Sequence, residues 1–226
     1  MISIDSVYQR VLVLANKEQR GYITPQEFNL LATHAQNDIF EQYFYDLNQF
    51  RRLPGNDTKY ADMVDILEEK ISIFKQGPLA LNNEDSLTDV YRLTDLNYNG
   101  KILTEIRYED YYKIQTPLLK PSTHRPVYWI KNGAIYFEGI PSGEAVSAHY
   151  IRKPKSPNWT YQEVGTSGVP MYDDSKSDHQ NFELHASEET DLVIKILGLF
   201  GITTKDTLLY QTAVAEDTKN IQQEKL

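Results

Sequence analysis

The sequence predicts an α+β protein in which N- and C-terminal helices form a bundle and a small antiparallel β-sheet domain is inserted between them. Hydrophobic residues recur with a helical period through the first third of the chain and again near its end. In the middle of the chain, apolar and polar residues alternate with a period of two, which is typical of strands. Because the two helical parts flank the sheet in sequence, the simplest arrangement packs them against each other.

Three apolar stripes predict three helices in the first third. The first stripe consists of Ile4, Val7, Tyr8, Val11, Leu12 and Ala15. A second helix is expected from Thr24, which forms a capping box with Glu27 and is followed by proline at the first helical position. This helix runs to about Phe50. A third follows between residues 60 and 74, and Gly77-Pro78 is expected to stop it.

Two Asn-Gly pairs, at residues 99–100 and 132–133, predict hairpins with type I′ turns, because asparagine and glycine tolerate the positive φ that both turn positions need. One further strand is expected after the second hairpin, giving a single sheet of about five strands. The expected strands are Val90–Tyr98, Lys101–Ile106, Val127–Lys131, Ala134–Glu138 and Ala145–Arg152.

These elements divide the chain into four parts: 1–84, the N-terminal part of the bundle; 85–153, the antiparallel β domain; 154–186, an extended surface loop; and 187–226, C-terminal helices that complete the bundle and end in a docking tail. The third part is rich in proline, glycine and polar residues and shows no periodicity. Ser187-Glu188-Glu189 predicts the start of a helix that Gly201 ends, and a last helix is expected from residue 204 to 223.

The composition excludes several classes of protein. The 226 residues carry 23 Lys and Arg against 32 Asp and Glu, a formal charge of −9, and contain no cysteine. The chain therefore has no disulfide scaffold, thiolate zinc site or cysteine nucleophile, and the acidic balance argues against a dedicated DNA binder. The longest apolar run, Leu192–Ile202, is far shorter than the roughly 20 residues that span a bilayer. The N-terminus has no basic leader, and Val11–Ala15 is too short for the apolar region of a signal peptide, so we expect a protein made and kept in a cytoplasm.

No pattern predicts chemistry. The sequence lacks the common nucleophile, zinc-protease and nucleotide-binding motifs. Asp95 to Gly100 resembles the first half of a calcium loop, but Ile106 stands where the bidentate glutamate is required, so the hairpin turn explains this segment better. His179 and His185 match no zinc spacing. We therefore expect no catalytic residue, no metal and no cofactor, and we do not favour an enzyme.

Aromatic residues are the more informative feature. The chain has 16 tyrosines, and its aromatic residues come in bursts. Tyrosine is enriched at protein interfaces, because it buries a large rigid surface while its hydroxyl keeps a polar partner. The residues expected at subunit interfaces are Phe40, Tyr43, Phe44, Tyr45, Tyr111 and Tyr112. The last helix carries sparse apolar residues that fit a partner's groove, although packing on the chain's own bundle would give the same pattern. These residues are Leu208, Leu209, Val214 and Ile221.

The layout resembles the head-to-tail adaptor (connector) proteins of tailed bacteriophages, in particular tail tubular protein A of short-tailed phages and the ring protein of crAss-like phages. The resemblance rests on the order of elements and on the segments Asp89–Leu93, Tyr128–Phe137 and Tyr150–Pro154. It covers nearly the whole chain, although the segment 155–185 is longer than in the tail tubular pattern. Its motifs are structural rather than chemical.

The resemblance implies a structural virion protein at the head-tail junction, made in the cytoplasm of a bacterial host. Such adaptors form a homo-oligomeric ring, commonly a dodecamer, between the portal protein and the tail, nozzle or tail-fibre proteins, and genomic DNA passes through the ring without specific binding. The portal-docking segment would be 204–226 and the projecting domain 85–152. The alternatives are another neck or tail-ring protein and, less favoured, a carbohydrate- or receptor-binding module.

Overall fold

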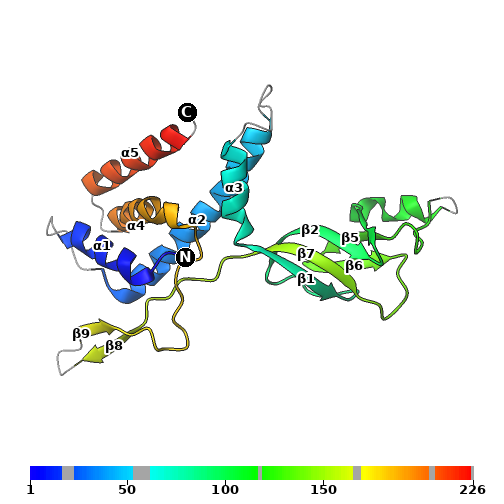
Figure 1. Ribbon diagram of the computed structural model, residues 1–226, viewed down its shortest axis with the longest axis horizontal. Helices are drawn as coiled ribbons and strands as arrows, with labels where there is room; N and C mark the ends of the chain where they lie inside the picture. The colour runs from blue at the N-terminus through cyan, green and yellow to red at the C-terminus, as the bar shows by residue number, and fades with distance from the viewer. Residues whose placement is uncertain (17–22, 53–61, 117–118, 165–168, 204–206, 225–226) are drawn as a thin grey trace. The chain divides into compact units, whose positions relative to one another are not determined.

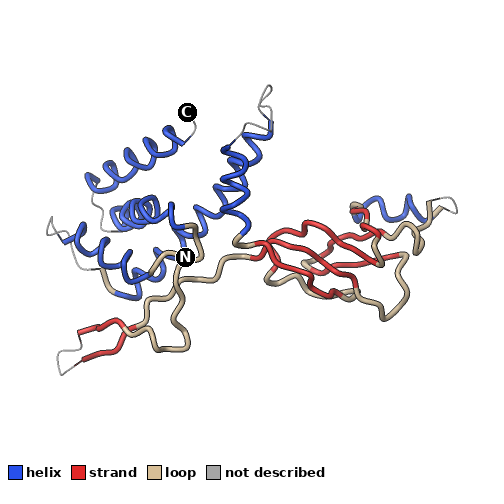
Figure 2. The backbone as a smooth tube through the Cα atoms, viewed as in Figure 1, coloured by secondary structure: helices blue, strands red, loops and turns tan. Residues whose placement is uncertain are grey.

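The computed structural model describes residues 1–16, 23–52, 62–116, 119–164, 169–203 and 207–224 (Figures 1 and 2). It is a mixed α+β structure with small sheets that are mainly antiparallel, as the sequence predicts. The chain divides into two compact units. We call residues 1–73 and 154–226 the helical unit and residues 74–153 the β unit.

The helical unit contains α1 (Ile4–Asn16), α2 (Pro25–Arg52), α3 (Asp62–Ser72), α4 (Glu189–Thr203) and α5 (Thr207–Glu224), with a 3-10 turn, η2 (Ala186–Glu188), before α4. α4 contacts α1, α2 and α5, and α3 packs on α2. The predicted stripe of α1 faces the interior, where all its members except the half-buried Leu12 are buried. The largest fully buried side chains of this unit are Ile4, Ile23, Phe28, Phe182, Leu184, Leu192 and Ile196.

The predicted capping box at the start of α2 is confirmed. The backbone N–H of Thr24 donates to Glu27 Oε2 at 3.0 Å, and the N–H of Glu27 donates to Thr24 Oγ1 at 3.3 Å. These two bonds satisfy donors that a helix N-terminus leaves without partners. The hydrogen bonds from Thr24 also hold the pKa of Glu27 below its usual value. At the other end of the unit, Gly201 does not end α4, which continues to Thr203, and Gly201 is buried.

The β unit holds two sheets. One has the order β1-β7-β2-β3, with β1 (Lys75–Leu81), β7 (Val146–Arg152), β2 (Val90–Tyr98) and β3 (Lys101–Ile102). The other has β5 (Val127–Lys131) between β6 (Ala134–Glu138) and the parallel β4 (Thr104–Glu105). Asn99 and Asn132, with their glycines, have the positive φ angles expected of the two hairpins. A core that includes Leu81, Leu96, Leu103, Tyr128, Ile135, Val146 and Ala148 joins residues of both sheets.

Three expectations are corrected. The single five-strand sheet is divided in two, because β5 pairs with β4 and β6, and neither β5 nor β6 pairs with β7. The β unit begins at Phe74 rather than at residue 85, since β1 is an additional strand paired with β7. Gly77-Pro78 lies inside β1, at a register shift between Gln76 and Leu79. Proline is tolerated there because β1 is an edge strand and the ladder is already interrupted.

The segment 154–186 is not structureless. It contains β8 (Tyr161–Val164) and β9 (Val169–Tyr172), which pair as an antiparallel hairpin that belongs to the helical unit. Figure 1 draws this hairpin in yellow, near α1. The expected surface excursion therefore has a defined secondary structure of its own.

Two glycines of the β unit provide a stability test. Gly139 and Gly143 have nearly equal φ values of 89° and 90°, but a Cβ at Gly139 would lie 2.7 Å from the backbone oxygen of Ser122, whereas a Cβ at Gly143 would meet nothing within 4 Å. Gly143→Ala should therefore cost only the strain of positive φ, about 1 to 2 kcal/mol of unfolding free energy. Gly139→Ala should cost about 1 to 3 kcal/mol more, because backbone must move. Denaturant unfolding of both variants measures the difference, and equal losses would contradict this account.

Candidate functional site

α4 is the helix around which the candidate surfaces gather. Apolar residues lie around most of its circumference, including Leu192, Val193, Ile194, Ile196 and Leu197. A helix with so wide an apolar surface requires cover on several sides. α1, α2 and α5 contact it, yet Ile194 is only half-buried. The helical unit therefore leaves part of α4 without apolar cover of its own.

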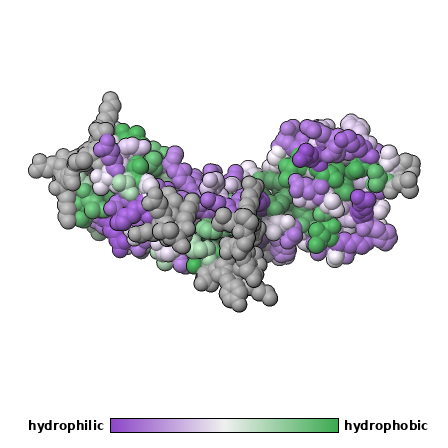
Figure 3. Space-filling model, turned by 90° about the horizontal axis from the view of Figure 1, so that it is seen from above, coloured by the Kyte–Doolittle hydropathy of each residue, from purple (hydrophilic) through white to green (hydrophobic). Residues whose placement is uncertain are grey.

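An apolar groove of about 490 Å³ runs between α1 and α4. Its walls are Gln9, Arg10, Val13 and Leu14 of α1 and Thr190, Val193, Ile194 and Leu197 of α4, and we call it the α1–α4 groove. Val13 is 54% exposed and Leu14 is 46% exposed. The rim carries one ion pair, between Arg10 and Glu189 at 3.1 Å. Figure 3 shows hydrophobic residues reaching the surface of the helical unit among hydrophilic ones.

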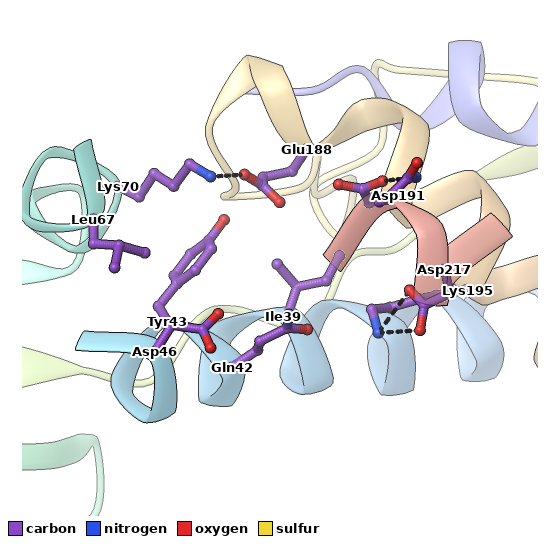
Figure 4. Close-up of a pocket in the computed structure, with 11 residues that line it drawn as sticks. Ile39, Gln42, Tyr43, Asp46, Leu67, Lys70, Glu188, Asp191, Lys195 and Asp217 are labelled. Carbon is purple, nitrogen blue, oxygen red and sulfur yellow. Dashed lines mark hydrogen bonds and ion pairs between the residues drawn. The ribbon is translucent and has the colours of Figure 1, made fainter. Parts of the chain in front are cut away.

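A cluster of charged side chains joins α3 and α5 to the first turn of α4 (Figure 4). Lys70 Nζ lies 2.6 Å from Glu188 Oε1, and both side chains are almost completely buried, at 11% and 6% exposure. Asn220 Nδ2 donates to Asp191 Oδ1 at 2.6 Å, and Lys195 pairs with Asp217 at 3.3 Å. Burial raises the pKa of Asp191, opposed by the hydrogen bond from Asn220. The Lys70–Glu188 pair fixes α3 on η2, the turn that leads into α4, and the other two contacts fix α5 on α4.

This cluster has little room for a ligand. The enclosed space is about 30 Å³, which is the volume of about one water molecule. Within the described part of the chain, no group of three or more His, Cys, Asp or Glu side chains is placed to hold a metal ion. The geometry therefore fits a structural joint between helices rather than a substrate site.

The aromatic residues expected at interfaces fall into two groups. Phe40, Tyr43 and Phe44 are buried in the core of the helical unit, where Phe40 and Phe44 meet edge to face at 5.1 Å. This corrects the expectation for these three rings, because the helical period turns them toward the subunit's own interior. Tyr45, one position further along α2, is exposed.

Tyr111 and Tyr112 belong to a 3-10 helix of the β unit, η1 (Tyr108–Gln115). Tyr111 is half-buried and lies 4.8 Å from Trp129 of β5, whereas Tyr112 is 78% exposed. Trp129 stacks in turn on Tyr136 of β6 at 5.9 Å. The β unit thus carries an accessible aromatic surface on β5, β6 and η1.

The residues expected to dock on a portal lie on α5. The side chains of Leu208, Leu209 and Ile221 fall outside the described residues. Val214 is exposed and lies with Tyr210 and Ile202 beside a shallow groove between α4 and α5. Among residues 210–220 of α5, only Ala213 is buried.

Sequence reasoning missed the α1–α4 groove and the β8–β9 hairpin. One signal was present for the groove. Residues 11–15 are all apolar, so α1 has hydrophobic residues outside its inward-facing stripe. Val13 and Leu14 are these residues, and they line the groove.

No protein-family model matches the chain, and no curated protein is significantly similar to it. Over the described residues, no helix has the length and apolar character needed to cross a membrane. The candidate surfaces are therefore interpreted from their own geometry.

The buried ion pair gives a stability prediction. Lys70→Met leaves the Glu188 carboxylate buried without its lysine, and breaking such a pair costs about 3 to 5 kcal/mol. The matched control is Lys219→Met, which breaks an exposed pair with Glu216 and should cost about 0 to 1 kcal/mol. Denaturant unfolding compares the two, and similar losses would show that the buried pair does not hold α3 on α4.

Asp191 gives a pH prediction. Its pKa lies above the ordinary value of 3.8 because burial disfavours the charged carboxylate, so its contribution to stability is greatest below pH 3.8 and falls as pH rises through the raised pKa. Asp191→Asn keeps an oxygen acceptor for Asn220 but cannot ionise. Relative to the unaltered protein, its free energy of unfolding should increase between about pH 3 and pH 7.

The control for this experiment is Glu27→Gln. The pKa of Glu27 is lowered, so this variant should lose stability relative to the unaltered protein as pH rises through the same range. Urea unfolding at several pH values measures both differences. Parallel trends for the two variants would refute the explanation given for Asp191.

Proposed function

We propose that this chain is a head-to-tail connector subunit of a tailed bacteriophage, which forms a homo-oligomeric ring between portal and tail in the virion. The observation that carries the proposal is the α1–α4 groove, an apolar surface with Val13 and Leu14 about half exposed, on the most hydrophobic helix of the unit. Exposed apolar surfaces of this kind mark sites of protein association. In this proposal the subunit has no catalytic role, and α1 to α5 act as one bundle that builds the ring wall.

The charge distribution supports a role around DNA. By sequence, the helical unit has 13 Lys and Arg against 23 Asp and Glu, a net charge of −10, whereas the β unit has 10 against 9, a net charge of +1. A duct lined by acidic surface repels phosphates, so that a genome moves through it without being held. The bundle is therefore the part that we assign to the channel, and the β unit is the part that projects toward tail proteins.

One further assignment follows from the resemblance and from the surfaces available. We assign portal docking to α5, whose described side chains between 210 and 220 are mostly exposed. A lower neck or tail ring would use the same subunit contacts, and it differs only in its position along the tail axis.

The aromatic surface favours a second candidate, a carbohydrate- or receptor-binding module. Tyr112 is almost fully exposed beside Tyr111 and Trp129, and exposed planar rings suit the apolar faces of sugars and of proteins. In this case the full chain should bind purified host-cell polysaccharide, and Tyr112→Ala should weaken that binding without changing self-association. Unaltered binding in Tyr112→Ala, or none in the full chain, would remove the candidate.

The test of the ring uses two leucines. Leu14→Glu places a charge in the α1–α4 groove and should weaken self-association at least about tenfold, which corresponds to the loss of about 1.4 kcal/mol. Leu30→Glu is the matched control, because Leu30 is 74% exposed on α2 and lines none of the pockets described above. Analytical ultracentrifugation, with and without purified portal protein, measures assembly. Equal assembly of both variants would exclude the groove as an interface.

The position in the virion is tested separately. Electron microscopy of particles carrying a labelled copy of the chain should place the label at the vertex between head and tail. A label lower on the tail axis would support the tail-ring alternative, and a chain that is absent from particles would refute a virion role.

A further inference from the structure

Both hairpin turns of the β unit carry the residue pair Asn-Gly, at 99–100 and at 132–133, and all four residues are exposed. Asparagine is among the residues least stable to prolonged warming. When glycine follows it, the glycine backbone nitrogen can reach the side-chain carbonyl carbon of the asparagine, because glycine has no Cβ in the way. The product of this attack is a succinimide ring. Each turn is therefore a potential site of spontaneous modification.

The backbone does not distinguish the two turns. Asn99 and Asn132 have φ values of 48° and 51°, and Gly100 and Gly133 have φ values of 78° and 73°. A Cβ on either glycine would meet nothing within 4 Å, so neither turn is crowded. A difference in reactivity must come from the hydrogen bonds that the reacting atoms make.

Hydrogen bonding at the reacting atoms does distinguish the turns. The backbone N–H of Gly100 donates to Asn97 Oδ1 at 2.9 Å, and this bond has to break before the nitrogen can attack Asn99. Among the described residues, the N–H of Gly133 and the carboxamide of Asn132 have no hydrogen-bond partner. The second turn therefore leaves both reacting groups available.

We propose that Asn132 is a site of spontaneous deamidation in the folded protein and that Asn99 is protected from it. The Gly133 nitrogen forms a bond to Cγ of Asn132, the bond from Cγ to the amide nitrogen breaks, and that nitrogen leaves as ammonia with the proton that Gly133 gives up. Water then adds to one of the two ring carbonyls, and the ring opens to aspartate or isoaspartate. Water is the only co-reactant, and nothing is oxidised or reduced.

The isoaspartate product changes more than the charge of this turn. Its main chain runs through the former side chain, which adds one carbon to the turn. The Gly133 carbonyl oxygen accepts the N–H of Leu87 at 2.9 Å, and Ser86 forms a bridge with Ala134, so the segment 84–87 is fastened to the turn and to the start of β6. A longer turn displaces this anchor, because loop length sets the register of a hairpin. We therefore expect the segment to loosen.

Peptide mapping by mass spectrometry tests the site. The full chain is kept folded at mildly alkaline pH and body temperature, and the mass increase that accompanies conversion of an amide into an acid is followed with time. It should accumulate at Asn132 about fivefold faster than at Asn99, a factor that corresponds to one hydrogen bond of ordinary net strength. In concentrated urea, where neither turn is folded, the two rates should converge.

Two variants of Asn97 test the cause. Asn97→Ala frees the N–H of Gly100, so deamidation of Asn99 should accelerate about fivefold and approach the rate at Asn132. Asn97→Asp is the matched control, because it keeps an oxygen acceptor for Gly100 and should keep Asn99 slow. Asn132 lies in the other hairpin and should react at the same rate in both variants and in the unaltered protein.

Hydrogen exchange tests the consequence. In protein aged until Asn132 has reacted, the backbone amide of Leu87 should exchange faster than in fresh protein. Freshly prepared Asn132→Asp carries the new charge without the added main-chain carbon, so exchange at Leu87 should stay slow in this variant.

Three results would overturn the inference. The first is a rate at Asn99 of the folded protein that equals or exceeds the rate at Asn132. The second is a folded protein in which neither site reacts while both react in urea, which would mean that the bond from Leu87 protects the second turn. The third is an Asn97→Ala variant in which Asn99 stays slow, because its protection would then have another cause.

Discussion

The helical unit depends on burying α4. Its side chains are apolar around most of the circumference, apart from the side that carries Asp191 and Lys195, so the neighbouring helices are positioned by the need to remove these apolar sides from water. Leu192 and Ile196 are fully buried, and α1, α2 and α5 contact the helix. The same requirement explains the α1–α4 groove, because α1, α2 and α5 do not cover all of the apolar surface of α4, as the half-buried Ile194 shows. In the proposed ring, a neighbouring subunit would complete this burial.

The start of α4 uses polar interactions for a different purpose. Glu188, Glu189 and Asp191 lie where the helix dipole favours negative charge, but Glu188 is also buried, which is unfavourable for a carboxylate without a cation. Lys70 of α3 supplies that cation at 2.6 Å. A buried pair of this kind adds little net stability over apolar packing, yet it makes any other placement of α3 costly, because both charges would then be buried alone. The pair therefore specifies where α3 sits.

Local signals predicted much of the fold and little of the candidate site. Helical period, the Thr24 capping box and the two Asn-Gly turns depend on residues close in sequence, and the structure confirms them. Strand β1 was missed because its partner, β7, lies some 70 residues away, as in the pairing of Gln76 with Tyr150, and because Gly-Pro is typical of a stop. The β8–β9 hairpin was missed since its stability comes from Trp159 rather than from alternation. The groove depends on which helices pack on α4, which no local pattern encodes.

Charge and apolar surface act against each other in this subunit. A helical unit with a net charge of −10 repels its copies. At ordinary ionic strength, dissolved salt screens this repulsion beyond about 8 to 10 Å, but it screens charges closer than that much less. Bringing such units side by side therefore requires short-range attraction, which a groove about 490 Å³ in volume lined by Val13, Leu14 and Ile194 can supply. The same repulsion disfavours any association between copies in which the groove stays exposed, because such an association lacks the apolar burial that offsets the repulsion. In the proposed ring, the acidic surface would thus have two effects: it would keep DNA from binding, and it would restrict assembly to contacts in which apolar surfaces meet.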